Sequence, residues 1–98
     1  MKYRNVKTGG YDSKKEAKRG TELKLLEKSG LITDLREQVK YQVIPKQDGE
    51  RAAHYIADFA YMTNGNLVVE DVKGFKTADY VLKRKLMLYV HGIKVVEI

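Results

Sequence analysis

Asp58, Asp71 and Lys73 are spaced so that a β-hairpin would bring their charges together. Between the two aspartates lies Asn64-Gly65, the dipeptide that best suits a two-residue type I′ turn, because both turn residues need a positive φ. Counting outward from that turn places Asp58 opposite Asp71 in the neighbouring strand. Because side chains alternate along a strand, Lys73 is expected on the same face as Asp71, and Glu70 on the other face.

Two carboxylates at opposed positions of a hairpin destabilise it. Their Cβ atoms would lie about 4.5–5.5 Å apart, where like charges repel. The hairpin is otherwise largely apolar, and the ammonium group of Lys73 follows shortly after Asp71. We therefore expect Asp58 and Asp71 to hold a divalent cation, for which carboxylate oxygens are suitable ligands.

The length and composition of the chain limit the class of protein. Its 98 residues are expected to form one small domain. The absence of cysteine excludes disulfides and thiolate zinc sites and is compatible with a reducing compartment. No apolar run approaches the roughly 20 residues that span a bilayer, and the N-terminus lacks the apolar region of a signal peptide. We expect a soluble, cytoplasmic protein with no membrane partner.

Basic residues are in excess and are clustered. The formal net charge of +6 favours a polyanionic partner. One cluster lies before residue 20, and a second is Lys83-Arg84-Lys85. Two such clusters beside a carboxylate site indicate a nucleic acid as the partner.

The chain is expected to divide into a basic N-terminal arm, residues 1–12, and a single domain, residues 13–98. The order αβββαβ predicts the α/β class, with a mixed central sheet flanked by helices and a parallel strand–helix–strand unit at the end. The predicted elements are a helix to about Ser29, a strand over Gln38–Ile44, the two hairpin strands on either side of Asn64-Gly65, a helix over about Ala78–Val90 and a strand over Ile93–Ile98.

The ends of the first helix have clear signals. Ser13 and Glu16 have the spacing of a capping box, and Gly30 is a suitable C-terminal residue. On a helical wheel Leu23 lies in the apolar stripe, with Glu16 beside it.

The second helix is expected to start at the N-cap Thr77. Its sequence predicts a buried stripe and places Tyr80 outward, near the start of the helix. The residues of that predicted stripe are Val81, Leu82, Leu86 and Tyr89.

An Asp in one strand, followed by Asp-x-Lys in the next and preceded by a helix with a Glu, resembles the PD-(D/E)XK nuclease superfamily. That superfamily includes Holliday-junction resolvases and the end-cleaving nucleases of some transposition systems. The resemblance covers roughly residues 13–98 and includes the αβββαβ order. A small, phage-associated branch is similar in three segments, which are Asp12-Ser13-Lys14-Lys15-Glu16, Glu70-Asp71-Val72-Lys73-Gly74 and Lys83-Arg84-Lys85-Leu86.

Two departures from the motif stand out. Ala57 replaces the Pro that precedes the first Asp, a Pro that carries no chemistry. Glu70 beside Asp71 permits another alignment, but only Asp71 is expected to share a face with Asp58 and Lys73.

The resemblance implies a divalent-metal-dependent DNA endonuclease that uses Mg²⁺ or Mn²⁺, in a bacterial host or encoded by a phage. Asp58 and Asp71 would ligate the metal with the carbonyl of Val72, and Glu16 would complete the shell directly or through water. Lys73 would orient the attacking water, stabilise developing charge or act as a base. The alternative helix carboxylate is Glu22. In that case Glu16 would only cap the first helix.

The substrate implied is DNA, branched or duplex, and a homodimer would be needed to cut both strands. Gln38 and Gln42 are further candidates for contact with phosphate or water. The residues expected to contact DNA are Lys14, Lys15, Lys18, Arg19, Lys76, Tyr80, Lys83 and Arg84. The alternative from another class is a non-catalytic basic DNA-binding protein with a degenerate nuclease fold, in which Asp71 and Lys73 form an ordinary ion pair.

Overall fold

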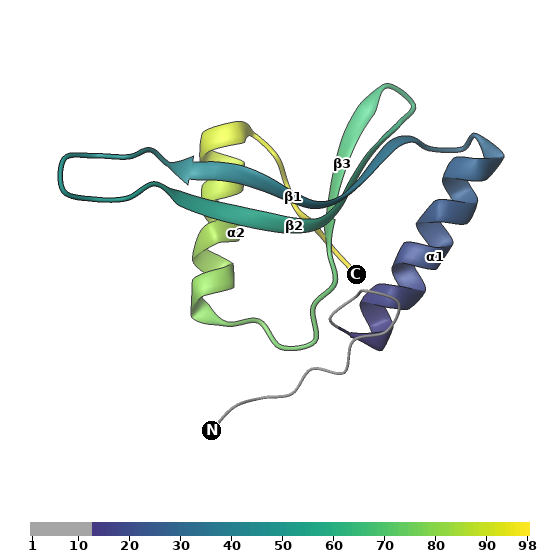
Figure 1. The fold of residues 1–98 in the computed structure, drawn as a ribbon, viewed down its shortest axis with the longest axis horizontal. Helices are drawn as coiled ribbons and strands as arrows, with labels where there is room; N and C mark the ends of the chain where they lie inside the picture. The colour runs from purple at the N-terminus through teal and green to yellow at the C-terminus, as the bar shows by residue number, and fades with distance from the viewer. Residues whose placement is uncertain (1–12) are drawn as a thin grey trace.

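The computed structural model describes residues 13–98, so the predicted basic arm at residues 1–12 lies outside the described residues. The described part has the α/β architecture and the element order expected from the sequence (Figure 1). The elements are α1 (Lys14–Ser29), β1 (Thr33–Ile44), β2 (Ala53–Thr63), β3 (Asn66–Asp71), α2 (Ala78–His91) and β4 (Val96–Glu97).

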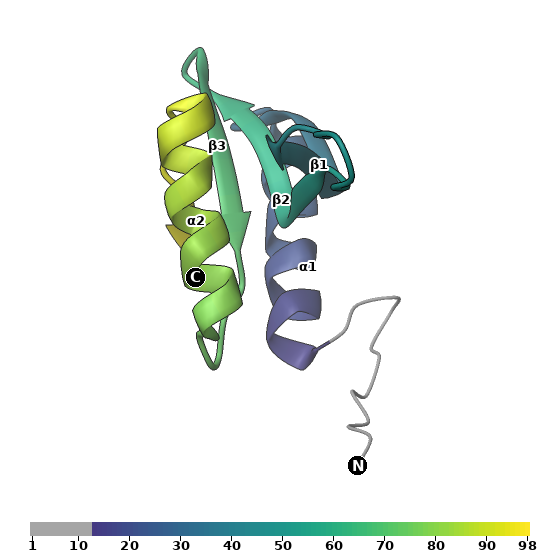
Figure 2. The same ribbon diagram turned by 90° about the vertical axis from the view of Figure 1, so that its left-hand side faces the viewer.

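The four strands of residues 13–98 form one mixed sheet in the order β1-β2-β3-β4. The first two pairings are antiparallel, and β3 pairs with β4 in parallel, as the strand–helix–strand pattern predicts. Figure 2 shows the sheet between α1 on one side and α2 on the other. A small core therefore lies on each face of the sheet.

The β2–β3 hairpin has the predicted turn and register. Asn64 and Gly65 both have a positive φ, 52° and 77°, as a type I′ turn requires. Thr63 pairs with Asn66, and Phe59 pairs with Glu70. The β2–β3 pairing ends there, and continuing its register by one residue brings Asp58 opposite Asp71.

Helix α1 begins and ends at the predicted residues. The side chain of Ser13 accepts a hydrogen bond from the amide of Glu16, and Gly30 ends the helix with a φ of 87°. Leu23 is fully buried and packs against Phe59 and Tyr61 of β2. This packing fixes the height of Glu16 above the sheet, because the two residues lie on the same side of the helix.

Helix α2 has the predicted caps, but the predicted buried face is right only in part, because Val81 and Leu86 pack against the core and Leu82 and Tyr89 do not. Thr77 caps the helix and Gly92 ends it. Tyr80 and Met87 are buried, whereas Leu82 is 57% exposed and Tyr89 is 87% exposed. The buried face therefore centres on Tyr80 and Met87 rather than on Leu82 and Tyr89. Tyr80 points into the molecule and not outward.

Two strand lengths also differ from the predictions. Strand β1 starts at Thr33 rather than at residue 38, since the irregular pairing between Thr33 and Arg36 and the positive φ of Asp34 hide the alternation there. Strand β4 is limited to Val96–Glu97, because β3 ends at Asp71 and offers no further partner. No helix within residues 13–98 combines the length and apolar composition that crossing a membrane requires.

Candidate active site

Asp58 and Asp71 lie where β2 and β3 separate. Strand β3 ends at Asp71, whereas β2 extends back to Ala53 and pairs there with β1 alone. After Asp71 the main chain no longer pairs with β2, and its next amide is instead bound by the side chain of Asp58. The amide of Val72 donates to Oδ2 of Asp58 at 2.8 Å. We call this place, where β3 ends at Asp71 and β2 continues past Asp58, the fork. Asp58 is thus bound to the main chain directly after Asp71.

Asp71 is buried, with 2% of its surface exposed. Its Oδ2 accepts a hydrogen bond of 2.5 Å from the hydroxyl of Tyr55 and lies 3.5 Å from Nζ of Lys73. Burial, followed by the neighbouring carboxylate of Asp58, raises the pKa of Asp71 to about 7, although Tyr55 and Lys73 act in the opposite direction. The carboxylate therefore lies in a place that favours either a proton or a cation.

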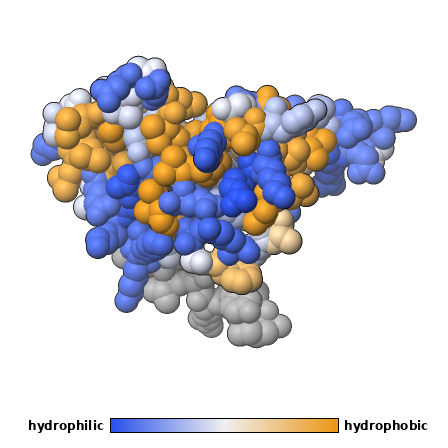
Figure 3. Space-filling view, turned by 180° about the vertical axis from the view of Figure 1, so that it is seen from behind, coloured by the Kyte–Doolittle hydropathy of each residue, from blue (hydrophilic) through white to orange (hydrophobic). Residues whose placement is uncertain are grey.

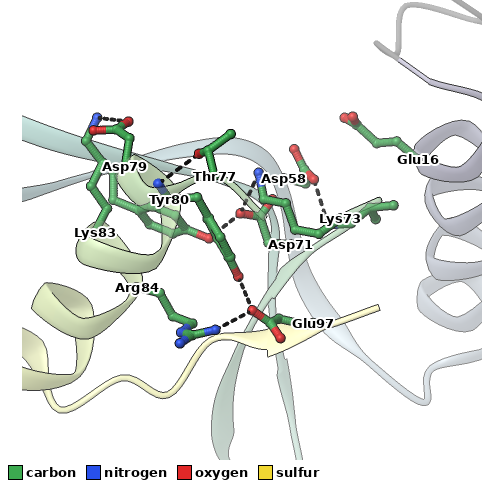
Figure 4. Close-up of polar contacts among 12 residues, drawn as sticks. Glu16, Asp58, Asp71, Lys73, Thr77, Asp79, Tyr80, Lys83, Arg84 and Glu97 are labelled. Atoms are coloured by element: carbon green, nitrogen blue, oxygen red, sulfur yellow. Dashed lines mark hydrogen bonds and ion pairs between the residues drawn. The ribbon is translucent and has the colours of Figure 1, made fainter. Parts of the chain in front are cut away.

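The ammonium of Lys73 lies beside Asp71, as predicted, although β3 ends at Asp71 and Lys73 is not part of the strand. Its ammonium lies 4.4 Å from the centre of the Tyr80 ring, and its carbonyl oxygen is 3.4 Å from Nζ of Lys15. Figure 4 shows Asp58, Asp71 and Lys73 gathered between α2 and the helix that bears Glu16.

Glu16 belongs to the same group, and Glu22 does not. The Glu16 side chain is 5% exposed, and its Oε2 is 3.2 Å from Nε2 of Gln38. The same nitrogen lies 3.4 Å from Oδ1 of Asp58, so one amide reaches both carboxylates. Glu22 is exposed on α1 and pairs with Arg19 at 3.3 Å. The structure thus places Glu16, not the alternative Glu22, beside the aspartates.

Gln38 has an unusual backbone as well as these two contacts. It lies opposite Asp58, between Glu37, which pairs with Phe59, and Val39, which pairs with Ala57. Its φ is 53°, a left-handed value that costs a non-glycine residue about 1 kcal/mol or more. Such strain concentrates at functional sites. The sequence predicted Gln38 only as a further candidate for contact with phosphate or water. Its place in the expected strand gave no indication of a positive φ.

Tyr55 was not predicted as a site residue. Its hydroxyl contacts Asp71, and burial, followed by that hydrogen bond, raises its pKa far above the ordinary value. The sequence gave no signal for this contact, because simple alternation places Tyr55 and Asp58 on opposite faces of β2.

Glu70 points to the opposite face, as predicted, and has a separate partner. Arg19 of α1 donates to both of its oxygens, from Nε at 2.8 Å and from Nη2 at 2.6 Å, and Tyr61 donates to it as well. The hydrogen bond to Glu70 is the main cause that raises the pKa of Arg19. Arg19 therefore joins α1 to β3 through Glu70, and its expected DNA contact stays a prediction.

The other residues expected to contact DNA fall into two groups. Lys14, Lys15 and Lys18 are exposed along α1. On α2 and before it, the basic side chains are paired with acids: Lys76 and Arg84 each lie 2.9 Å from Glu97, and Lys83 lies 3.7 Å from Asp79.

Tyr80 is not available to stack on a base, which corrects that expectation. It is 6% exposed, and its hydroxyl donates to Glu97 at 2.7 Å. Glu97 lies in β4, beside Asp71 in the sheet register, and only the folded chain brings it to Tyr80.

Two hollows flank the fork. One, of about 280 Å³, lies between β2 and the start of α2 and is lined by Ile56, Lys73 and Thr77, among others. The other, of about 240 Å³, lies on the α1 side and includes Lys15 and Lys18 in its lining. The first hollow reaches Asp71, whereas the second is lined by neither aspartate.

The two aspartates are the candidate ligands for a divalent cation. Within residues 13–98, no three acidic or histidine side chains lie close enough to form a complete metal site as they stand. Mg²⁺ needs fewer protein ligands, since it is held by one or two carboxylates together with phosphate and water. Asp58 and Asp71 supply such a pair, and the raised pKa of Asp71 marks a repulsion that a cation would relieve.

Comparison with known proteins gives one match. No curated protein and no solved structure matches the chain. The sequence model of one family, described as "Protein of unknown function (DUF1064)", matches residues 1–95. Because this match covers nearly the whole chain, the protein belongs to the DUF1064 family.

Proposed function

We propose that this protein is a divalent-metal-dependent DNA endonuclease of the PD-(D/E)XK type. Its active centre would consist of Asp58, Asp71, Lys73 and Glu16. The observation that supports the proposal most strongly is the convergence of the first three at the fork between β2 and β3, with Lys73 3.5 Å from Asp71. Glu16 reaches the same place from α1 through Gln38.

Each residue has a role that follows from its surroundings. Asp58 and Asp71 bind the cation, and Tyr55 orients the buried Asp71 carboxylate through its hydroxyl. Lys73 offers a positive charge at the edge of this pair, where negative charge develops on phosphate during hydrolysis. When bound, Mg²⁺ or Mn²⁺ supplies Lewis-acid activation of the phosphodiester and lowers the pKa of water.

The proposed substrate is DNA recognised through its backbone. The exposed lysines of α1 supply phosphate contacts, which give affinity without reading sequence. The elements of residues 13–98 are those of the core itself and leave no separate base-reading module in that range. We therefore propose activity on branched or recombination intermediates, as in Holliday-junction resolvases, or on duplex DNA with low sequence specificity.

A direct test is incubation of supercoiled plasmid and a four-way junction with Mg²⁺, Mn²⁺ or EDTA. The expected result is cleavage that requires metal and is lost in Asp71→Asn and Lys73→Gln. Two matched variants serve as controls, because Asp48→Asn in the β1–β2 loop and Lys28→Gln at the end of α1 change exposed residues away from the fork. Equal cleavage by wild type and both site variants would reject the proposal.

A non-catalytic DNA-binding protein is the second candidate. Its support is the lack, in the described part of the chain, of a complete three-residue metal site. In that case the junction is bound but not cut in any metal, and binding by Asp71→Asn equals that of wild type.

Cutting both strands of a duplex would require two centres, and we propose a homodimer for that purpose. Leu82, Leu88 and Tyr89 are exposed on α2. In Figure 3 apolar areas on the face opposite to that of Figure 1 are interspersed with hydrophilic ones. Analytical ultracentrifugation tests this part of the proposal, and a monomer with and without junction DNA would reject it.

A further inference from the structure

The main chain alone does not hold Lys73 in place. The residue follows the end of β3 and precedes α2, in a segment outside any helix or strand. Lysine also has a long, flexible stem that can adopt many rotamers. A defined position for its ammonium therefore depends on side-chain contacts.

Besides Asp71, the side-chain contact that the structure gives the Lys73 ammonium is the ring of Tyr80. The 4.4 Å separation is within the range of a cation–π interaction, which attracts an ammonium to the face of an aromatic ring. The Tyr55 ring, whose hydroxyl holds Asp71, lies 6.3 Å from that of Tyr80. Neighbouring tyrosines thus contact the two members of the Asp71–Lys73 pair.

Residue Tyr80 is held through its main chain and its side chain. The main-chain amide donates to the N-cap oxygen of Thr77 at 3.1 Å, and the ring hydroxyl donates to Glu97 at 2.7 Å. Glu97 is in turn held by Lys76 and Arg84, each at 2.9 Å. The basic residues before and within α2 therefore organise the support of the ring.

We propose that Tyr80 is a positioning residue for Lys73: its ring, locked by Glu97 of β4, keeps the Lys73 ammonium beside Asp71. A role of this contact in catalysis rests on the proposed nuclease function. The position of the Lys73 ammonium does not depend on that function, so it can be tested separately.

The first measurement is NMR of the side-chain methylene protons of Lys73. In wild type the ring current of Tyr80 shifts them upfield, and Tyr80→Leu abolishes the shift. Tyr80→Phe keeps the ring and retains most of the shift, and Glu97→Gln reduces it. Tyr89→Leu is the matched control on the same helix, since Tyr89 is 87% exposed, and leaves the shift intact. Unshifted Lys73 protons in wild type overturn the proposal.

The second measurement is cleavage kinetics. Tyr80→Leu lowers kcat about tenfold and leaves KM unchanged, the size expected for losing a partly desolvated cation–π contact. Tyr80→Phe loses less than about threefold. In a Lys73→Gln background Tyr80→Leu causes no further loss, because Tyr80 acts through Lys73.

The two measurements separate the possible failures. Independent, additive losses in the Lys73→Gln background, or full activity in Tyr80→Leu, overturn the positioning role. If Tyr80→Leu does not fold, Tyr80→Phe and Glu97→Gln provide the same test. A Glu97→Gln protein that keeps both the ring-current shift of Lys73 and the wild-type kcat overturns the role of Glu97 in holding the Tyr80 ring. A wild type that shows the ring-current shift but cuts no DNA refutes the nuclease proposal and leaves the position of Lys73 supported.

Discussion

Asp71 is 2% exposed, and its carboxyl group interacts with that of Asp58. Burial and that neighbour raise its pKa to about 7. A raised pKa means that the stability from this group is fully present below its unfolded value, near 4, and is lost as the pH rises through about 7. Around and above neutral pH the metal-free fold is therefore weakened by the same carboxylate that a cation would require.

Asp71→Asn should thus separate stability from activity. At pH 8 in EDTA we expect the variant to melt about 5 °C above wild type, a gain on the order of 1 kcal/mol, because it removes a buried charge and can still accept from Tyr55. The gain should vanish at pH 4, and Mg²⁺ should stabilise wild type alone. Thermal melts at both pH values check this, and a variant that melts below wild type at pH 8 contradicts it.

Gln38 offers a second test at a single residue. Gln38→Gly should stabilise the fold slightly by relieving the positive φ, yet lower the cleavage rate about tenfold by removing the amide between Glu16 and Asp58. Asp34→Gly is the matched control, because Asp34 has nearly the same φ, 54°, and lies outside the fork. It should give the same gain in melting temperature with full activity. Equal activity in both glycine variants would remove Gln38 from the site.

At the scale of elements, each helix is joined to the sheet by an ion pair between an arginine of the helix and a glutamate of a strand. Arg19 joins α1 to Glu70 of β3, and α2 is joined to β4 through Glu97. Both contacts connect residues far apart in the sequence. They determine how the helices are turned over the strands that bear the aspartates.

Arg19→Met should destabilise the protein by about 3 kcal/mol, because it leaves the Glu70 carboxylate buried without its bidentate partner. Lys18→Met changes an exposed neighbour and should stay within about 0.5 kcal/mol of wild type. Urea unfolding measures both. If the two variants are equally stable, the Arg19–Glu70 pair does not anchor α1.

Glu97 predicts how stability changes in acid. Its hydrogen bonds with Tyr80, Lys76 and Arg84 lower its pKa to about 2. A lowered pKa gives stability that is present above the unfolded value, near 4.5, and lost as the pH falls through about 2. The stability difference between wild type and Glu97→Gln should thus be constant above about pH 5 and shrink towards pH 2. Urea unfolding across that range checks it, and a pH-independent difference would contradict it.

These elements also show what could be read from the sequence. The hairpin register was predictable because Asn64-Gly65 specifies its turn locally and alternation does the rest. The buried face of α2 was not, because apolar residues surround much of that helix and the choice of Tyr80 depends on Glu97 in β4. Nor was the bridge made by Gln38, whose backbone is set by tertiary contacts. Asp58, Asp71 and Lys73 could be predicted from neighbouring sequence alone. The residues that hold them, such as Tyr55 and Tyr80, depend on contacts between distant parts of the chain.

At the scale of the whole molecule, the basic excess is divided between structure and surface. On and near α2 several basic side chains pair with acids, whereas Lys14, Lys15 and Lys18 are exposed on α1. Lys15 also contacts the main chain of Lys73. The proposed DNA path therefore crosses α1 and meets the fork from that side.

Replacing Lys14, Lys15 and Lys18 together with Gln should reduce the salt dependence of DNA binding. The slope of log K against log salt should become less negative by roughly 3, because each lost phosphate contact releases about one counterion fewer. Fluorescence anisotropy over a salt series measures the slope, with Lys28→Gln as the exposed control on the same helix. An unchanged slope would move the DNA path away from α1.

The central claim is that the fork between β2 and β3 hydrolyses phosphodiesters with a divalent cation. Single-turnover cleavage of a labelled four-way junction in Mg²⁺ tests it most directly, with wild type, Asp58→Asn, Asp71→Asn and Asp48→Asn compared side by side. We predict that both fork variants lose at least about 100-fold in rate while the Asp48 variant cuts like wild type. Cleavage that persists in EDTA, or that survives in both fork variants, would contradict the account.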